Sequence, residues 1–131
     1  MLLQGEQLKR YRDEIAVLHR QAFGEEIKSA SFFGVFDGDQ LAAAAALKNY
    51  MGHWYMRGCV VKPEYRGRGF QRQLLKERLA HLAGKAKIVR VTVLPDNIYS
   101  INNLVAEGFA YDNKTKIINK KLHHVYKRDL G

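Results

Sequence analysis

The sequence has little of several residue types and patterns, and each shortage excludes a class of protein. Of its 131 residues, one is cysteine and two are proline. With Cys59 as the single cysteine, an internal disulfide is excluded, so an apolar core must stabilise the fold, which a chain of this length can form. No stretch approaches the ~20 apolar residues of a membrane span, and the start, MLLQGEQLKRYRDE, lacks the apolar run of a secretory signal. We expect one domain over residues 1–131, in the cytoplasm.

Acidic residues are also in short supply. Lys and Arg number 22 against 13 Asp and Glu, which gives a formal net charge of +9. Such an excess favours a polyanionic partner, and nucleic acid, an acidic membrane and a multiply phosphorylated small molecule all qualify. The densest basic block, residues 114–121, alternates with Thr, Ile and Asn. We interpret that block as a solvated loop and strand edge.

Hydrophobic periodicity predicts an α/β fold. Apolar residues at helical spacing indicate helices over residues 7–23, from 70 to a capping glycine at 84, and over 100–107. Runs rich in β-branched and aromatic residues predict strands at 54–61, 87–94, 109–112 and 122–130. Strand 54–61, the following helix and strand 87–94 fit one crossover unit with its two strands parallel.

Residues 31–50 predict two further strands, joined by a tight turn at Asp37-Gly38. This dipeptide is typical of two-residue hairpin turns, in which both central residues have positive φ. The second arm contains a run of five alanines, residues 42–46, which has high helix propensity. Its place directly after a hairpin turn favours a strand.

The segment Tyr65-Arg66-Gly67-Arg68-Gly69 lies between a predicted strand and a predicted helix. Backbone N–H groups at a helix N-terminus bind phosphate, and glycines let the backbone approach an anion closely. Arginines at 66, 68 and 72 add charge-assisted hydrogen bonds. Neither a GxxxxGK[ST] loop nor a GxGxxG fingerprint fits. The segment predicts a phosphate or pyrophosphate site, with a glycine-rich turn bearing solvated arginines as the alternative.

The longer stretch VVKPEYRGRGFQRQLL resembles motif A of the GNAT superfamily of acyl-CoA-dependent N-acetyltransferases. That motif is a strand ending V-x-P, followed by (R/Q)xxGx(G/A) at the start of a helix. Val61 and Pro63 fit the first part, and Arg66, Gly69 and Gln71 occupy the three marked positions of the second. Gln71 departs from the usual Gly or Ala.

A second stretch, VLPDNIYSINNLVAEGF at residues 93–109, resembles motif B of the same superfamily. Asn97, Gly108 and Phe109 match that motif in spacing. Ser100 replaces the frequent Ala, and Leu104 stands where many members have the Tyr that faces the thioester sulfur.

The resemblance implies a GNAT-like fold, an α/β architecture in which helices flank a mixed, strongly twisted sheet of about six strands. In such folds the sheet splays open between its two central parallel strands, and acetyl-CoA lies in the cleft as a cosubstrate. The cofactor-binding residues that the resemblance implies are Cys59, Val60, Val61, Arg66, Gly67, Arg68, Gly69, Phe70, Gln71, Asn97, Ser100 and Asn103.

Acetyl transfer to an amine requires a neutral nucleophile, a polarised thioester carbonyl and a proton for the departing thiolate. The resemblance assigns the carbonyl to a backbone N–H near Val61. A base is harder to choose, because neither strand 54–61 nor strand 87–94 contains a carboxylate. We take His53, Tyr99 and Tyr111 as the candidate catalytic side chains. The alternatives are that His53 is an ordinary turn residue, that the tyrosines serve only in packing, and that a chain of water molecules acts as the base.

These expectations combine into an N-acetyltransferase that moves the acetyl group of acetyl-CoA to a primary amine by direct attack in a ternary complex. The acceptor, a small-molecule or peptide amine, is expected beside the first helix and the loop after it, residues 23–31, together with the final strand pair. Glu25 and Glu26 in that loop would attract a cationic amine, with two solvated acids as the alternative. The alternative is a non-catalytic acyl-CoA-binding or nucleic-acid-binding module on the same fold. We expect no metal, because His123 and His124 lack other ligand-like neighbours. We expect no membrane partner, do not favour nucleic acid, and leave a homodimer open.

Overall fold

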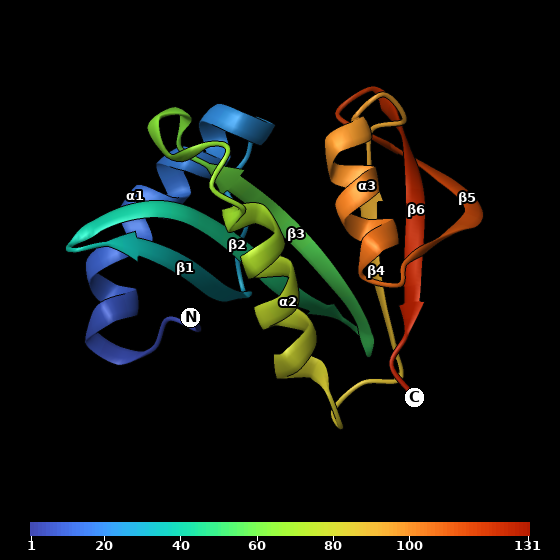
Figure 1. The fold of residues 1–131 in the computed structure, drawn as a ribbon, viewed down its shortest axis with the longest axis horizontal. Coiled ribbons are helices and arrows are strands. Elements are labelled where there is room, and N and C mark those ends of the chain that lie inside the picture. Colours follow the sequence, from blue (N-terminus) through green and yellow to red (C-terminus); the bar gives the residue numbers. More distant parts are fainter. The chain divides into compact units, whose positions relative to one another are not determined.

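The computed structural model describes residues 1–131, which form two compact units. The first unit holds residues 1–48 and 57–80, and the second holds residues 49–56 and 81–131. One six-stranded sheet runs through the chain in the order β1-β2-β3-β4-β6-β5 (Figure 1). Its strands are β1 (Ser31–Asp37), β2 (Gln40–Tyr50), β3 (His53–Val61), β4 (Ile88–Val93), β5 (Ala110–Ile118) and β6 (Lys121–Asp129). The predicted mixed α/β fold with about six strands flanked by helices is confirmed.

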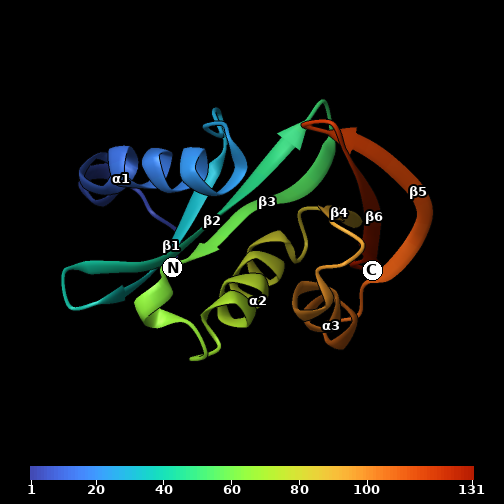
Figure 2. The same ribbon diagram turned by 90° about the horizontal axis from the view of Figure 1, so that it is seen from above.

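In the first unit, helices α1 (Gly5–Phe23) and α2 (Phe70–Leu82) cover opposite faces of β1 and β2 (Figure 2). All seven residues from Leu41 to Leu47 of β2 are buried, because both faces of the strand are covered. Alanine is small enough to let a helix approach the sheet closely. The alanine run is therefore a strand, as its position after the turn predicted, and helix propensity is overridden by packing.

The turn between β1 and β2 lies one residue later than predicted. Asp37 pairs with Gln40, so the central residues of the turn are Gly38 and Asp39. Gly38 has φ of +59°, whereas Asp39 is not among the residues with positive φ. The prediction that both central residues need positive φ was wrong, because a turn with glycine at its first central position requires it there alone.

In the second unit, β4 pairs with strands on both of its sides. Trp54 to Met56 of β3 run parallel to residues 89–91 of β4, and β6 runs antiparallel to β4 with Val91 opposite Tyr126. The predicted parallel pairing is confirmed. Helix α3 (Ile98–Ala106) lies along β4 and β6 (Figure 1), and Leu104 on α3 is buried.

Strand β5 confirms that the basic block contains a strand edge and corrects the extent of its loop. β5 extends to Ile118, beyond the predicted end at 112, so residues 114–118 belong to a strand and not to a loop. The strand is mostly exposed and occupies one edge of the sheet, where lysines discourage pairing with other chains. Asn119 and Lys120 turn into β6 with φ of +50° and +64°. The lack of a buried face explains why no apolar alternation marked this strand.

None of the helices is long and apolar enough to cross a membrane.

Candidate functional site

The segment after β3 makes a short 3₁₀ turn at Pro63–Tyr65 and then enters α2 through two glycines. Gly67 and Gly69 have φ of +79° and +78°, and a Cβ on either would meet no atom within 4 Å. Positive φ is costly for most L-residues, so the backbone conformation requires glycine. The open space beside both glycines leaves room for a ligand against the backbone.

Helix α2 begins with a hydrogen bond from the amide of Gln73 to the carbonyl of Gly69, 3.0 Å long. The amides of Gly69 and Phe70 precede this bond and lie outside the helical ladder. Arg66 and Arg68 are exposed beside them, and the Arg68 guanidinium lies 5.2 Å from the centre of the Tyr65 ring. Backbone donors, a helix N-terminus and two cations therefore gather in residues 65–70, which we call the glycine loop. This combination suits a diphosphate.

Tyr65 ties the glycine loop to the end of β1. Its hydroxyl donates a hydrogen bond to Oδ2 of Asp37 at 3.0 Å, and its ring centre lies 6.4 Å from that of Phe70. The hydrogen bond to the carboxylate raises the pKa of Tyr65, because a phenol that donates to a carboxylate resists losing its proton. Since Asp37 ends a paired strand, this bond restrains the entry to the loop.

Strand β3 contains an irregular residue just before the predicted cofactor contacts Cys59, Val60 and Val61. Gly58 has φ of +61°, and a Cβ there would lie 2.4 Å from Cδ1 of Ile27 and 2.6 Å from Nε2 of His19. Both the backbone conformation and the close packing therefore require glycine. The Gly58 carbonyl faces α1, where the His19 ring lies 2.7 Å away.

The side chains around Cys59 argue against a nucleophilic role for it. Burial raises the pKa of the Cys59 thiol, and the nearby positive charge of Arg78 opposes this only in part. The group therefore stays a thiol at neutral pH. Arg78 is 4% exposed and donates to the carbonyls of Leu74 and Ala46 at 3.1 and 3.2 Å. Burial lowers the pKa of Arg78.

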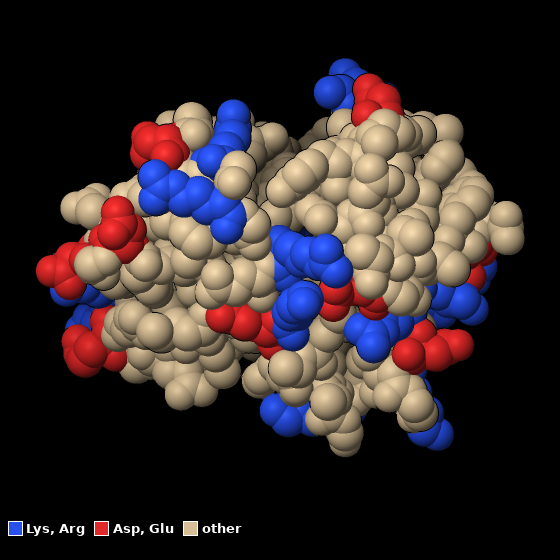
Figure 3. All heavy atoms as spheres, in the orientation of Figure 1, with Lys and Arg blue, Asp and Glu red and all other residues tan.

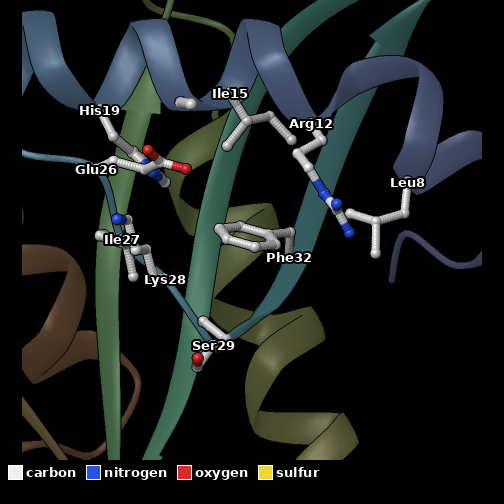
Figure 4. A pocket seen from close by; sticks show the side chains of 11 residues that line it. Leu8, Arg12, Ile15, His19, Glu26, Ile27, Lys28, Ser29 and Phe32 are labelled. Atoms are coloured by element: carbon white, nitrogen blue, oxygen red, sulfur yellow. The ribbon is translucent and has the colours of Figure 1, made fainter.

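A cavity of about 260 Å³ lies in the first unit between α1, the segment that follows it and β1 (Figure 4). Ile15 and Phe32 form its apolar middle, Arg12 reaches in beside them, and Glu26 lies next to His19. Its full lining is Leu8, Arg12, Ile15, Ala16, His19, Glu26, Ile27, Lys28, Ser29, Ala30 and Phe32. Apolar walls with a few polar groups are the usual composition of a small-molecule site.

The two glutamates that sequence analysis placed near the acceptor are both ion-paired. Glu25 lies 3.2 Å from Arg57, and Glu26 lies 3.2 Å from Arg20. Their charges are therefore partly neutralised. Of the two, Glu26 alone lines the cavity.

In the second unit, Asn97 has a local structural role. Its side-chain oxygen accepts a hydrogen bond from the Ser100 amide at 3.2 Å and so caps α3. Asn103, six residues after Asn97, buries its side-chain nitrogen with no hydrogen-bond partner. A buried donor without a partner is costly, and its presence is explained if a ligand accepts that hydrogen bond.

The candidate catalytic side chains all lie in the second unit, at separate places. His53 is exposed at the first residue of β3, and Tyr99 is 59% exposed on α3. Tyr111 on β5 stacks on His124 with ring centres 4.7 Å apart. Their roles stay predictions.

His19 and Arg78 are buried polar residues that the sequence motifs did not mark as candidates. His19 follows Tyr11 and Ile15 at helical spacing on the apolar stripe of α1, so its burial was detectable from the pattern. Arg78 lies one turn after Leu74 and Leu75 on the buried side of α2.

Comparison with known proteins gives one family. The profile described as the acetyltransferase (GNAT) family matches residues 3–109. The chain belongs to the GNAT acetyltransferase family. A search of curated protein sequences finds no match.

Solved structures with this GNAT fold include a Bacillus subtilis acetyltransferase in complex with CoA, with a TM-score of 0.78 and 16% identity over 100% of this chain and 97% of that one. The ribosomal-protein-S18-alanine N-acetyltransferase from Escherichia coli has a TM-score of 0.74 and 14% identity, over 100% of this chain and 92% of that one. A spermidine N-acetyltransferase chimera from Vibrio cholerae and hSSAT has a TM-score of 0.78 and 15% identity, over 99% of this chain and 95% of that one. At such identities the likeness shows the fold.

The structure contains no group of three or more His, Cys, Asp or Glu side chains arranged to hold a metal ion.

Proposed function

We propose that this GNAT chain is an acetyl-CoA-dependent N-acetyltransferase that acylates a primary amine. The observation that carries the proposal is the glycine loop. Two glycines with positive φ face open space, and they lead into the N-terminus of α2 beside two exposed arginines. A CoA diphosphate would interact with these backbone donors and these arginines at the same time. A turn that only contacts solvent would not need to bring such groups together.

Further proposed cofactor contacts lie along β3 and near the start of α3. Cys59, Val60 and Val61 would offer backbone groups to the pantetheine, which carries amide donors and acceptors of its own. Gln71 puts a longer side chain at a motif position that usually holds Gly or Ala, while its backbone amide is retained. Asn97, Ser100 and Asn103 complete the proposed contacts, and the buried Asn103 nitrogen without a partner supports that role.

The proposed reaction is direct transfer. The neutral amine attacks the thioester carbonyl carbon, a C–N bond forms and the C–S bond breaks. The nitrogen loses one proton, and the CoA thiolate gains one. Holding amine and thioester together can supply much of the rate, so a strong base is not obligatory. His53, Tyr99 and Tyr111 are our candidates for proton transfer.

The cavity beside α1 is the proposed acceptor site. Its apolar middle suits the carbon chain of an amine. Glu26, ion-paired with Arg20, is the one carboxylate in a lining that also holds Arg12 and Lys28. Among the proteins of this fold described above, one is a spermidine and one a protein-alanine N-acetyltransferase. We propose an acceptor of this kind, a small-molecule or peptide amine.

The proposal is tested with calorimetry and a thiol-release assay. We expect saturable heat on titration with acetyl-CoA, and release of free thiol with at least one of spermidine, a panel of amino acids and peptides with a free N-terminus or lysine. Arg66→Ala should weaken acetyl-CoA binding about tenfold, as expected for loss of a charge-assisted contact. Arg10→Ala, which removes an exposed charge from α1, is the matched control. Absence of acetyl-CoA binding would overturn the proposal.

The alternative is a non-catalytic module that uses the net charge of +9 to bind nucleic acid. The charges on the face shown in Figure 3 do not favour it. On the face shown in Figure 3, Lys and Arg occur in separate groups with Asp and Glu among them, and they form no continuous basic stripe. Steeply salt-dependent DNA binding without thiol release would favour this alternative.

A further inference from the structure

His19 forms an unusual contact. Its ring is fully buried on α1, and its Nε2 lies 2.7 Å from the carbonyl oxygen of Gly58. A carbonyl oxygen only accepts hydrogen bonds, so Nε2 carries the proton and donates. The other ring nitrogen, Nδ1, is buried and has no partner. An apolar residue would fill this space without the cost of an unpaired nitrogen, so the hydrogen bond to Gly58 is what a histidine adds.

The carbonyl that His19 holds belongs to the same peptide group as the N–H of Cys59. The chain has no cis peptide bonds, and in a trans peptide the C=O and N–H point in opposite directions. Since the carbonyl faces α1, the Cys59 N–H faces the other side of β3. That side of the first unit carries α2 and the glycine loop (Figure 2).

The orientation of this peptide depends on Gly58. With φ of +61° the residue departs from extended strand geometry, and Ile27 and His19 pack against it too closely for any side chain. The peptide group is thus turned out of the regular strand and clamped from the α1 side. A flexible peptide would not hold its N–H in the fixed direction that is needed to stabilise a developing oxyanion.

We propose that His19 is a positioning residue for acetyl transfer, which holds the Gly58–Cys59 peptide so that the Cys59 N–H donates to the thioester carbonyl of acetyl-CoA. The inference rests on the proposed function and deepens it, because it adds His19 as the side chain that positions the backbone donor implied by the resemblance. The hydrogen bond from His19 also polarises that peptide, which makes its N–H a better donor.

The single cysteine permits a direct test. Selective labelling with ¹⁵N-cysteine gives one backbone amide signal, that of Cys59. We expect the Cys59 amide proton to move further downfield with saturating acetyl-CoA than with saturating CoA, because CoA lacks the acetyl carbonyl. Identical signals in the two complexes would overturn the inference and leave the proposed function in place. If calorimetry shows that acetyl-CoA does not bind at all, the proposed function fails as well.

Two substitutions test the role of His19. His19→Gln keeps a neutral N–H donor at a similar reach, and His19→Leu keeps the volume without a donor. In His19→Leu we expect the acetyl-CoA-specific shift to disappear and kcat to fall about tenfold or more, with the KM for acetyl-CoA little changed. His19→Gln should restore both. Equal shifts in His19→Leu and wild type would overturn the proposal, and identical signals with the two ligands in wild type would overturn it even if His19→Leu fails to fold.

Discussion

The hydroxyl of Tyr65 and the carboxylate of Asp37 are hydrogen-bonded at 3.0 Å, although the two residues are 28 positions apart. The bond joins the entry of the glycine loop to the end of a paired strand, so the loop is restrained before any ligand arrives. Restraint of this kind improves binding because less entropy is lost when the ligand binds.

Tyr65→Phe should therefore weaken acetyl-CoA binding by about two- to fivefold, the effect of one exposed hydrogen bond. The variant keeps the ring that lies beside Phe70 and under Arg68. Asp37→Asn should have a similar effect, and the double variant should be no worse than either single one. Calorimetric titration measures all three. Additive losses would show that the two residues act independently.

Gly69→Ala should cost stability and binding separately. Its φ of +78° is strained for alanine, which costs about 1 kcal/mol in folding. Gly38 has φ of +59° and equally open surroundings, so Gly38→Ala is a matched control. Urea denaturation should show comparable losses in the two variants. Acetyl-CoA affinity should fall at least about tenfold in Gly69→Ala alone, because the added methyl group occupies the ligand's side of the loop. Equal affinities would contradict a phosphate role for the loop.

Stability should depend on pH through His19. Burial lowers the pKa of His19 below its ordinary 6.5; the hydrogen bond to Gly58 opposes that shift, Arg57 adds to it, and Glu26 opposes it. The unfolded chain therefore binds more protons than the folded one as pH falls below about 6.5. The free energy of unfolding should decline with falling pH in that range and level off below the folded pKa.

His19→Gln isolates this effect, because the other four histidines are present in both proteins. The difference in unfolding free energy between wild type and variant, measured by urea denaturation from pH 7.5 to 4.5, should change with pH in the direction just given. A difference that stays constant would mean that the pKa of His19 is the same in the folded and unfolded chain.

Arg78→Ala should destabilise the fold by about 3 kcal/mol, since it leaves a cavity and removes the buried donors to Leu74 and Ala46. Arg78→Met should lose less than half as much, because it fills the space and removes a charge that burial disfavours. Denaturant unfolding compares the two. Equal losses would show that the guanidinium hydrogen bonds outweigh the packing of the side chain.

Prediction from sequence was most successful where patterns are local. The glycine loop could be predicted as an anion-binding segment because its glycines, its arginines and the start of a helix lie within a few residues of one another. The alanine strand was found from its place after a turn, since its composition favours a helix. Residues 114–118 were missed as a strand because an edge strand exposed to solvent on both faces has no apolar alternation to detect.

The sequence by itself determined the α/β class, the order of the elements, the glycine loop and the resemblance to the GNAT superfamily, because each depends on residues that are neighbours along the chain. Tertiary structure alone decided which distant groups meet. Gly58 reads as an ordinary strand residue until folding brings the His19 ring and the Ile27 side chain, 39 and 31 positions earlier, against its backbone. Contacts at such separations depend on how helices pack on strands, and no local pattern records them.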